Sequence, residues 1–156
     1  MQQLRKTITA IFVVAVIVNY PWELAQTPLY EGMGNFRRML WHCFAASLGD
    51  GLLVLLIFGV GWAVLGRRDW YAQPGIRGYA LMLAAGLAIA VAVEWVAVGI
   101  ARRWTYNDRM PIVPLLGVGL APVAQMLLLP PLVFRVVAAW RGNTVNDMGD
   151  RNSPER

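Results

Sequence analysis

Long apolar stretches constrain this sequence more than any other feature, and short basic clusters separate the four of them. An α-helix rises about 1.5 Å per residue, so about 20 apolar residues span a hydrocarbon core roughly 30 Å thick. Inside lipid every backbone polar group needs a partner within the protein, which favours helices. The sequence therefore predicts an all-α integral membrane protein, a four-helix bundle of antiparallel up-down-up-down topology.

We expect one transmembrane domain over 1–140 and a disordered, polar C-terminal tail over 141–156. A retained first helix is favoured over a signal peptide, because no cleavage motif of small residues follows its apolar run. Trp70 and Tyr71 follow two arginines, a pattern typical of a turn at the level of the lipid headgroups. The predicted helices cover 7–29, 41–65, 78–101 and 112–137.

Basic residues occur in pairs between the apolar stretches, in a chain whose net charge is +5. Such flanking pairs anchor membrane helices and set their orientation, so we expect no nucleic-acid partner. Their excess on the side of the two termini predicts a multi-pass protein of the bacterial cytoplasmic (inner) membrane, with both termini in the cytoplasm. The only cysteine, Cys43, excludes an intramolecular disulfide and a multi-cysteine metal site.

Glu94 is the only charged residue in the apolar run 79–101. A carboxylate at a helix centre costs at least about 2.5–3.5 kcal/mol on insertion scales, so it needs partners. Gly86 and Ala90 precede it at intervals of four, and small residues on one helix face allow a second helix to approach closely. We therefore expect the face that carries Glu94 to point into the bundle.

Alternating helix directions place Glu94 in the same half of the bilayer as three other ionisable residues. We expect these to be catalytic candidates in one outer-leaflet cavity, because carboxyl groups and an imidazole act as general acids and bases. The four candidates are Glu23, His42, Asp50 and Glu94. Arginines of the loop after the third helix are expected at the entrance, where they suit phosphate or carboxylate headgroups. The predicted ligand-binding residues are Asn19, Arg102, Arg103, Tyr106, Arg109 and Gln125.

The predicted cavity favours a lipid-like or isoprenoid ligand and acid–base chemistry on it, with membrane lipids and a small amphipathic ligand as partners. Three alternatives stay open: polar groups that only hold the bundle together, an accessory or assembly subunit of a membrane complex or a homodimer, and a small proton-coupled transporter. Transport is disfavoured, because 52–65 and 79–92 offer no polar path through the other half of the bilayer.

The sequence predicts no metal and no cofactor. Carboxylate-bridged di-metal bundles use Glu-x-x-His pairs on two helices, and His42 is the only histidine of this chain. A mononuclear site at the four catalytic candidates is geometrically feasible and stays the lesser alternative.

Short motifs carry two resemblances. The segments Asn-Tyr-Pro-Trp-Glu-Leu-Ala-Gln, Ala-Ser-Leu-Gly-Asp, Glu-Trp, Arg-Trp-x-Tyr and Met-Pro resemble those of small uncharacterised bacterial membrane proteins; they lie at 19–26, 46–50, 94–95, 103–106 and 110–111. The chain is also superficially similar to the small subunits of heterodimeric carotenoid (lycopene) cyclases, whose proline-containing motif ends in paired glutamates. Here Pro21-Trp22-Glu23 is followed by Leu24, so the second glutamate is missing. This likeness implies a substrate of the isoprenoid class.

Overall fold

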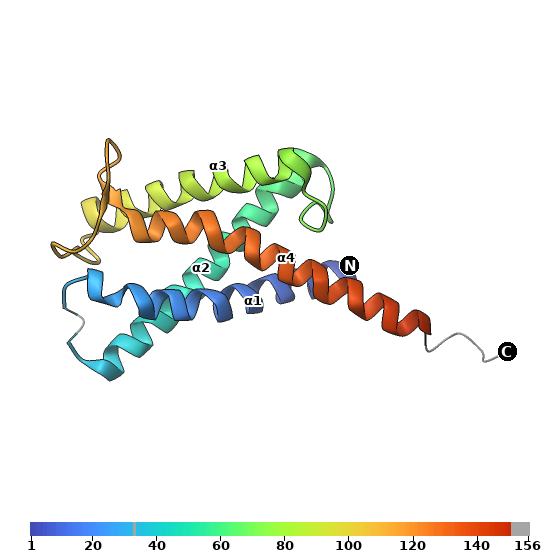
Figure 1. Ribbon diagram of the computed structural model, residues 1–156, viewed down its shortest axis with the longest axis horizontal. Coiled ribbons are helices and arrows are strands. Elements are labelled where there is room, and N and C mark those ends of the chain that lie inside the picture. The colour runs from blue at the N-terminus through green and yellow to red at the C-terminus, as the bar shows by residue number, and fades with distance from the viewer. Residues whose placement is uncertain (33, 151–156) are drawn as a thin grey trace.

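The computed structural model describes residues 1–32 and 34–150. Within these residues the chain is mostly helical, and four long helices lie alongside one another (Figure 1). They are α1 (Gln2–Gln26), α2 (Phe36–Leu65), α3 (Gly75–Glu94) and α4 (Leu120–Asp150). All four are long and apolar enough to cross a membrane, as the sequence predicted. Consecutive helices run in opposite directions, so the connections 27–35 and 95–119 meet at one end, here called the loop end (Figure 1).

The second helix begins earlier than the predicted residue 41. Asn35 caps it, because its side-chain oxygen accepts the backbone N–H of Arg38 at 3.0 Å and satisfies one of the free donors of the first turn. At the other end Gly66 adopts a left-handed conformation with a φ of 70° and donates its N–H to the carbonyl of Trp62. A residue without a Cβ adopts this conformation readily, so α2 ends there.

The first and third helices each pass into a different helical turn at the loop end. The 3-10 turn η1 (Thr27–Leu29) follows α1, and the π-helical segment η2 (Trp95–Ile100) follows α3. Glu94 is therefore the last α-helical residue before a stretch of wider turns, a deviation that is frequent at functional sites.

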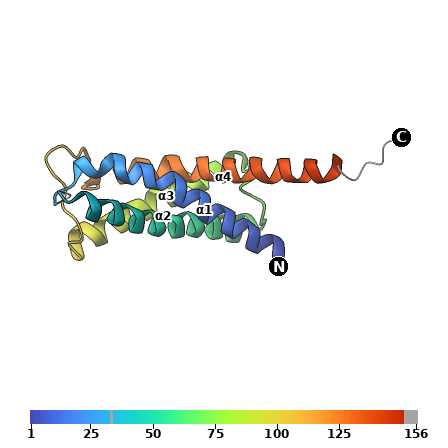
Figure 2. The ribbon, with the colours of Figure 1, turned by 90° about the horizontal axis from the view of Figure 1, so that it is seen from below.

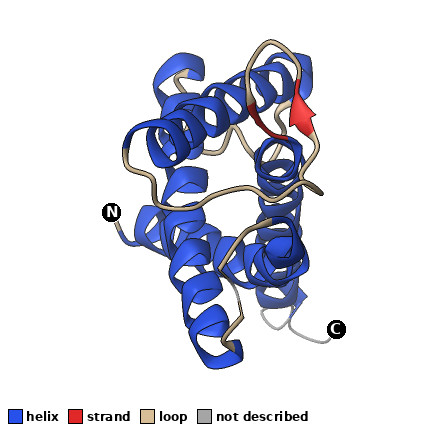
Figure 3. Ribbon diagram, turned by 90° about the vertical axis from the view of Figure 1, so that its left-hand side faces the viewer, coloured by secondary structure: helices blue, strands red, loops and turns tan. Residues whose placement is uncertain are grey.

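The fourth helix begins at Leu120 and not at the predicted residue 112. Strands β1 (Ile112–Val113) and β2 (Val118–Gly119) pair as a small antiparallel hairpin, which lies at one side of the loop end of the bundle (Figure 3). Leu115 and Gly117 in its turn have positive φ angles, and a right-handed helix cannot contain such residues. The prediction read these apolar residues as part of the helix because hydropathy does not distinguish them.

At its other end α4 runs beyond the predicted residue 137 to Asp150 and extends past the other helices (Figure 2). This differs from the disordered tail expected from 141 onward, of which 151–156 lies outside the described residues. Pro130 and Pro131 lie inside α4.

The apolar core fills the half of the bundle away from the loop end. Trp70 lies within it with no exposed surface, donates its indole N–H to the carbonyl of Phe58 at 3.1 Å and packs edge-on against Phe134. The turn therefore folds back so that Trp70 and Tyr71 are buried in the bundle, and their expected position at the level of the lipid headgroups stays a prediction. Gly61 makes this fold possible, because a Cβ there would lie 2.1 Å from the indole ring.

Helices α3 and α4 approach closely along the face that carries Glu94. A Cβ on Gly86 would lie 2.3 Å from the backbone oxygen of Met126, so only glycine allows this contact. The buried positions of α3 repeat every four residues, and the sequence predicted the last three of them: Gly78, Met82, Gly86, Ala90 and Glu94. This face directs Glu94 toward the interior.

Candidate functional site

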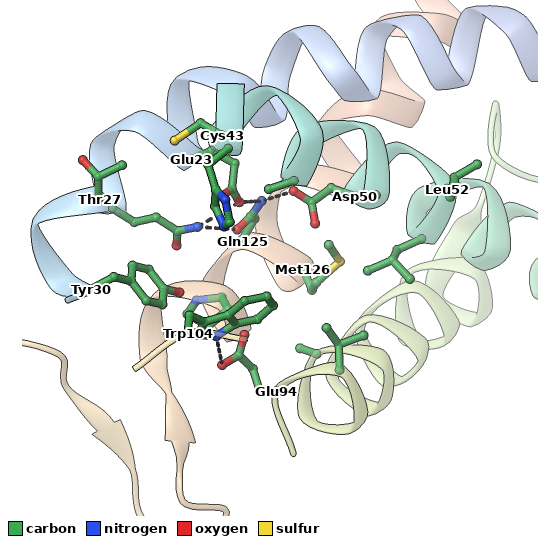
Figure 4. A pocket seen from close by; sticks show the side chains of 18 residues that line it. Glu23, Thr27, Tyr30, Cys43, Asp50, Leu52, Glu94, Trp104, Gln125 and Met126 are labelled. Atoms are coloured by element: carbon green, nitrogen blue, oxygen red, sulfur yellow. Dashed lines mark hydrogen bonds between the residues drawn. The ribbon is translucent and has the colours of Figure 1, made fainter. Parts of the chain in front are cut away.

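A cavity of about 450 Å³ lies at the loop end, between α1, α2, α3 and α4 (Figure 4). Its walls are mainly apolar, with side chains such as Leu53, Val93 and Met126. Ligand pockets generally have this character, with a volume of about 300–1,000 Å³ and a few converging polar groups. The converging polar and ionisable groups here are Glu23, Gln26, His42, Asp50, Glu94 and Gln125.

Gln125 of α4 is the centre of the polar network. Its amide nitrogen lies 2.8 Å from Asn19 Oδ1, 2.9 Å from Glu23 Oε1 and 2.8 Å from Asp50 Oδ2. A primary amide has only two N–H donors, so three acceptors share them. The side chain of Gln125 is 2% exposed, so bulk water does not compensate. One neutral amide thus holds side chains from α1, α2 and α4 together.

Two of these acceptors are carboxyl groups, and they lie close together. Since Glu23 Oε1 and Asp50 Oδ2 both contact the same nitrogen, their separation cannot exceed the two hydrogen-bond lengths combined. The two carboxyl groups are thus neighbours in the cavity. Ionised carboxylates only accept hydrogen bonds, so a bond between the two requires a proton on one of them.

Glu94 lies on the opposite wall, 3% exposed, and the connection after α3 reaches back to it (Figure 4). The hydroxyl of Tyr106 donates to Glu94 Oε2, and the indole N–H of Trp104 lies 3.5 Å from the same oxygen. The Tyr106 oxygen in turn accepts the backbone N–H of Gly119 at 3.0 Å. The Tyr106 hydroxyl thus contacts both the Glu94 carboxylate and the hairpin.

Backbone hydrogen bonds fasten this connection to the one after α1. Glu31 donates to the carbonyl of Thr105 and Asn107 donates to that of Leu29, while the rings of Tyr30 and Tyr106 lie 5.8 Å apart. Burial raises the pKa of both tyrosine hydroxyls, and the Glu94 carboxylate raises each further. Both phenols therefore keep their protons and remain hydrogen-bond donors near neutral pH.

The structure brings most of the predicted site residues together. Glu23, His42, Asp50, Glu94 and Gln125 all line the cavity, His42 from an exposed position at its edge. Asn19 lies behind Gln125 with no exposed surface, and its own amide nitrogen donates to the carbonyl of Ala15. Tyr106 reaches the site through Glu94.

The loop arginines lie elsewhere. Arg102, Arg103 and Arg109 are exposed and none of them lines the cavity, because Trp104 and Tyr106 are the residues of this loop that turn inward. The expected place of these arginines at the entrance therefore stays a prediction. The loop covers the cavity with aromatic side chains.

Four polar or aromatic residues that line the cavity were not among the predicted site residues: Gln26, Thr27, Tyr30 and Trp104. Gln26 carried a signal, since it follows Glu23 by three positions and so lies on the same helix face. No sequence signal marked Tyr30 or Trp104, because their positions depend on contacts between two connections that are far apart in the sequence. Among the described residues, no group of three or more His, Cys, Asp and Glu is placed to hold a metal ion, which counts against the mononuclear site.

Comparisons with protein-family models, with curated proteins and with solved structures found no match to this chain. The resemblances drawn from short motifs therefore remain predictions.

Proposed function

We propose that this protein resides in the bacterial cytoplasmic membrane, with both termini in the cytoplasm, and binds a lipid-like or isoprenoid ligand in the cavity at its loop end. In this orientation the cavity lies in the outer leaflet. The observation that carries the proposal is the convergence of Glu23, Asp50 and Glu94 on a mainly apolar cavity within the bundle. Ionisable groups at membrane depth are costly and generally mark functional sites.

The route into the cavity supports a ligand that arrives from the lipid. Helices α2 and α3 diverge toward the loop end (Figure 1), and several lining residues of α2 are exposed: His42, Gly49 and Leu52. Connections carrying Tyr30 and Trp104 cover the end of the bundle. A chain-like ligand would therefore enter sideways, between α2 and α3.

Acid–base chemistry on the ligand is the second part of the proposal. Glu23 and Asp50 both contact the amide nitrogen of Gln125, so two carboxyl groups lie side by side, and carboxyl groups can act as general acids and bases. Glu94 stands on the other wall with the Tyr106 hydroxyl as its donor, and His42 lies at the edge. A bound ligand would thus have a proton donor and acceptor on either side.

Three alternatives have weaker support. A transporter needs access from both sides, whereas the other half of the bundle is filled by side chains that are at most 3% exposed: Ile11, Val54, Ile57, Phe58 and Phe134. A polar network with only a structural role would explain the hydrogen bonds of Gln125, but it would not explain why a cavity lies beside them. An accessory subunit of a membrane complex would also bind no ligand of its own in the cavity.

Co-purification tests the proposal directly. The full chain would be purified in a mild detergent, and mass spectrometry would identify the bound lipids and metals. We expect a chain-like compound that is reduced in the Glu94→Gln variant and lost in Gly49→Leu, which places a side chain in the cavity. Gly59→Leu is the matched control, since a Cβ at either glycine meets no atom within 4 Å and only Gly49 lines the cavity. The same cargo in Gly49→Leu and in the control would refute the proposal.

A further inference from the structure

We infer that the head of the ligand in this cavity is a protonated amine, and not a phosphate or a carboxylate. The inference rests on the proposed function, since it assigns the chemical class of the ligand bound at the same site. It reverses the expectation drawn from the loop arginines, which favoured an anionic head.

Gln26 supplies an acceptor that has no donor. Its amide nitrogen donates to Glu23 Oε1 at 2.8 Å and lies 3.3 Å from Gln125 Oε1, which fixes the orientation of the amide. Its oxygen then has no hydrogen-bond partner among the described residues, although the side chain is only 7% exposed and lines the cavity. A buried polar atom without a partner is costly, and a ligand that donates a hydrogen bond would satisfy it.

The charges of the cavity point in the same direction. Among the described residues, the groups that donate to its carboxylates are neutral: the amides of Gln26 and Gln125, the phenol of Tyr106 and the indole of Trp104. His42, at the exposed edge, is the only basic side chain among the described lining residues. The described lining residues thus include three carboxyl groups, those of Glu23, Asp50 and Glu94, against one basic side chain. An ammonium group supplies both a counter-charge and donors.

An anionic head would meet the opposite conditions. It would bring further acceptors beside the Gln26 oxygen and would lie against carboxylates in a site of low dielectric constant, where like charges repel strongly. The apolar tail of either kind of ligand has the same partners, since Leu52, Leu53 and Met126 form walls that carry no charge. The head therefore decides which amphiphile binds.

A series of probes that differ only in the head tests this inference. The full chain in detergent micelles would be titrated with hexadecylamine, hexadecanol, hexadecanoate and hexadecyl phosphate, and native mass spectrometry would give each Kd. We expect the amine to bind at least about tenfold more tightly than either anion, with the alcohol between them, as charge-assisted hydrogen bonds are about twice as strong as neutral ones.

Variants that replace a carboxylate by an amide distinguish the effect of lost charge on binding from the effect of lost folding. Asp50→Asn keeps the shape of the side chain, and we expect it to weaken binding of the amine by about tenfold while leaving the Kd of the alcohol within about twofold. Glu31→Gln is the control, because Glu31 is an exposed carboxylate at the same end that does not line the cavity.

Equal or tighter binding of hexadecanoate or hexadecyl phosphate would overturn the inference and leave the proposed ligand cavity standing. Tighter binding of the alcohol than of the amine would overturn it as well. If none of the probes binds, both the inference and the proposed function fail.

Discussion

Replacement of Gln125 by leucine should destabilise the bundle by about 2 kcal/mol. The variant removes the amide that contacts Asn19, Glu23 and Asp50, and each interhelical hydrogen bond in a membrane contributes on average about 0.6 kcal/mol. The figure is a lower estimate, because the partly buried Asp50 carboxyl group loses this donor, whereas Glu23 keeps that of Gln26, and an unsatisfied buried group adds about 1–3 kcal/mol.

Unfolding of the purified protein in mixed micelles, followed by far-UV circular dichroism as the fraction of denaturing detergent rises, measures this loss. Gln73→Leu is the control, because the Gln73 side chain is exposed and lies in the turn between α2 and α3. It should leave the free energy of unfolding within about 0.5 kcal/mol of the original.

A double-mutant cycle sharpens the test. Asp50→Leu alone should destabilise the protein, but in the Gln125→Leu background it should cost less, since removal of both partners leaves fewer unsatisfied groups. A loss below about 0.5 kcal/mol for Gln125→Leu, or strictly additive effects in the cycle, would refute the role of this amide as the link between helices.

Three further outcomes are expected. Gly61→Ala should lower the free energy of unfolding by about 1–3 kcal/mol in the same assay, because its Cβ overlaps a buried indole, whereas Gly59→Ala, which meets open space, should not. Tyr106→Phe should speed hydrogen exchange of the backbone amides in 104–110, because it removes the hydroxyl that joins Glu94 to the hairpin; unchanged exchange would contradict this. Because folding raises the pKa of Tyr30 and Tyr106, their contribution to stability should be complete below about pH 10, where unfolded tyrosine ionises, and should decline above it. Absorbance of tyrosinate during an alkaline titration would report the delayed ionisation, and titration of all tyrosines together near pH 10 would contradict it.

Much of the candidate site could be read from helical spacing alone. Glu94 follows Gly86 and Ala90 at intervals of four, and this pattern determines which face of α3 is buried. Alternation of helix direction then brings Glu23 and Asp50 to the same end as Glu94, where all three line one cavity. These deductions succeed because the rise and the turn of an α-helix are fixed.

Two features of the fold could not be predicted from the sequence. Trp70 is buried because a glycine on α2 offers space for its ring and a carbonyl accepts its N–H. Tyr106 turns inward because its hydroxyl is held by Glu94 and Gly119, whereas the loop arginines are exposed. Each outcome depends on contacts between residues that are distant in the chain, which no local pattern encodes.

The sequence by itself thus determined the number of long apolar helices, their buried faces and the end at which the carboxylates gather, because hydropathy and helical periodicity are local properties. Only the tertiary structure decided that one amide, Gln125, holds Glu23 and Asp50 together, and that the oxygen of Gln26 is left without a donor. Hydrogen bonds depend on distances and angles at the scale of tenths of an ångström. These are set when the helices pack, and they give the cavity its acidic, acceptor-rich character.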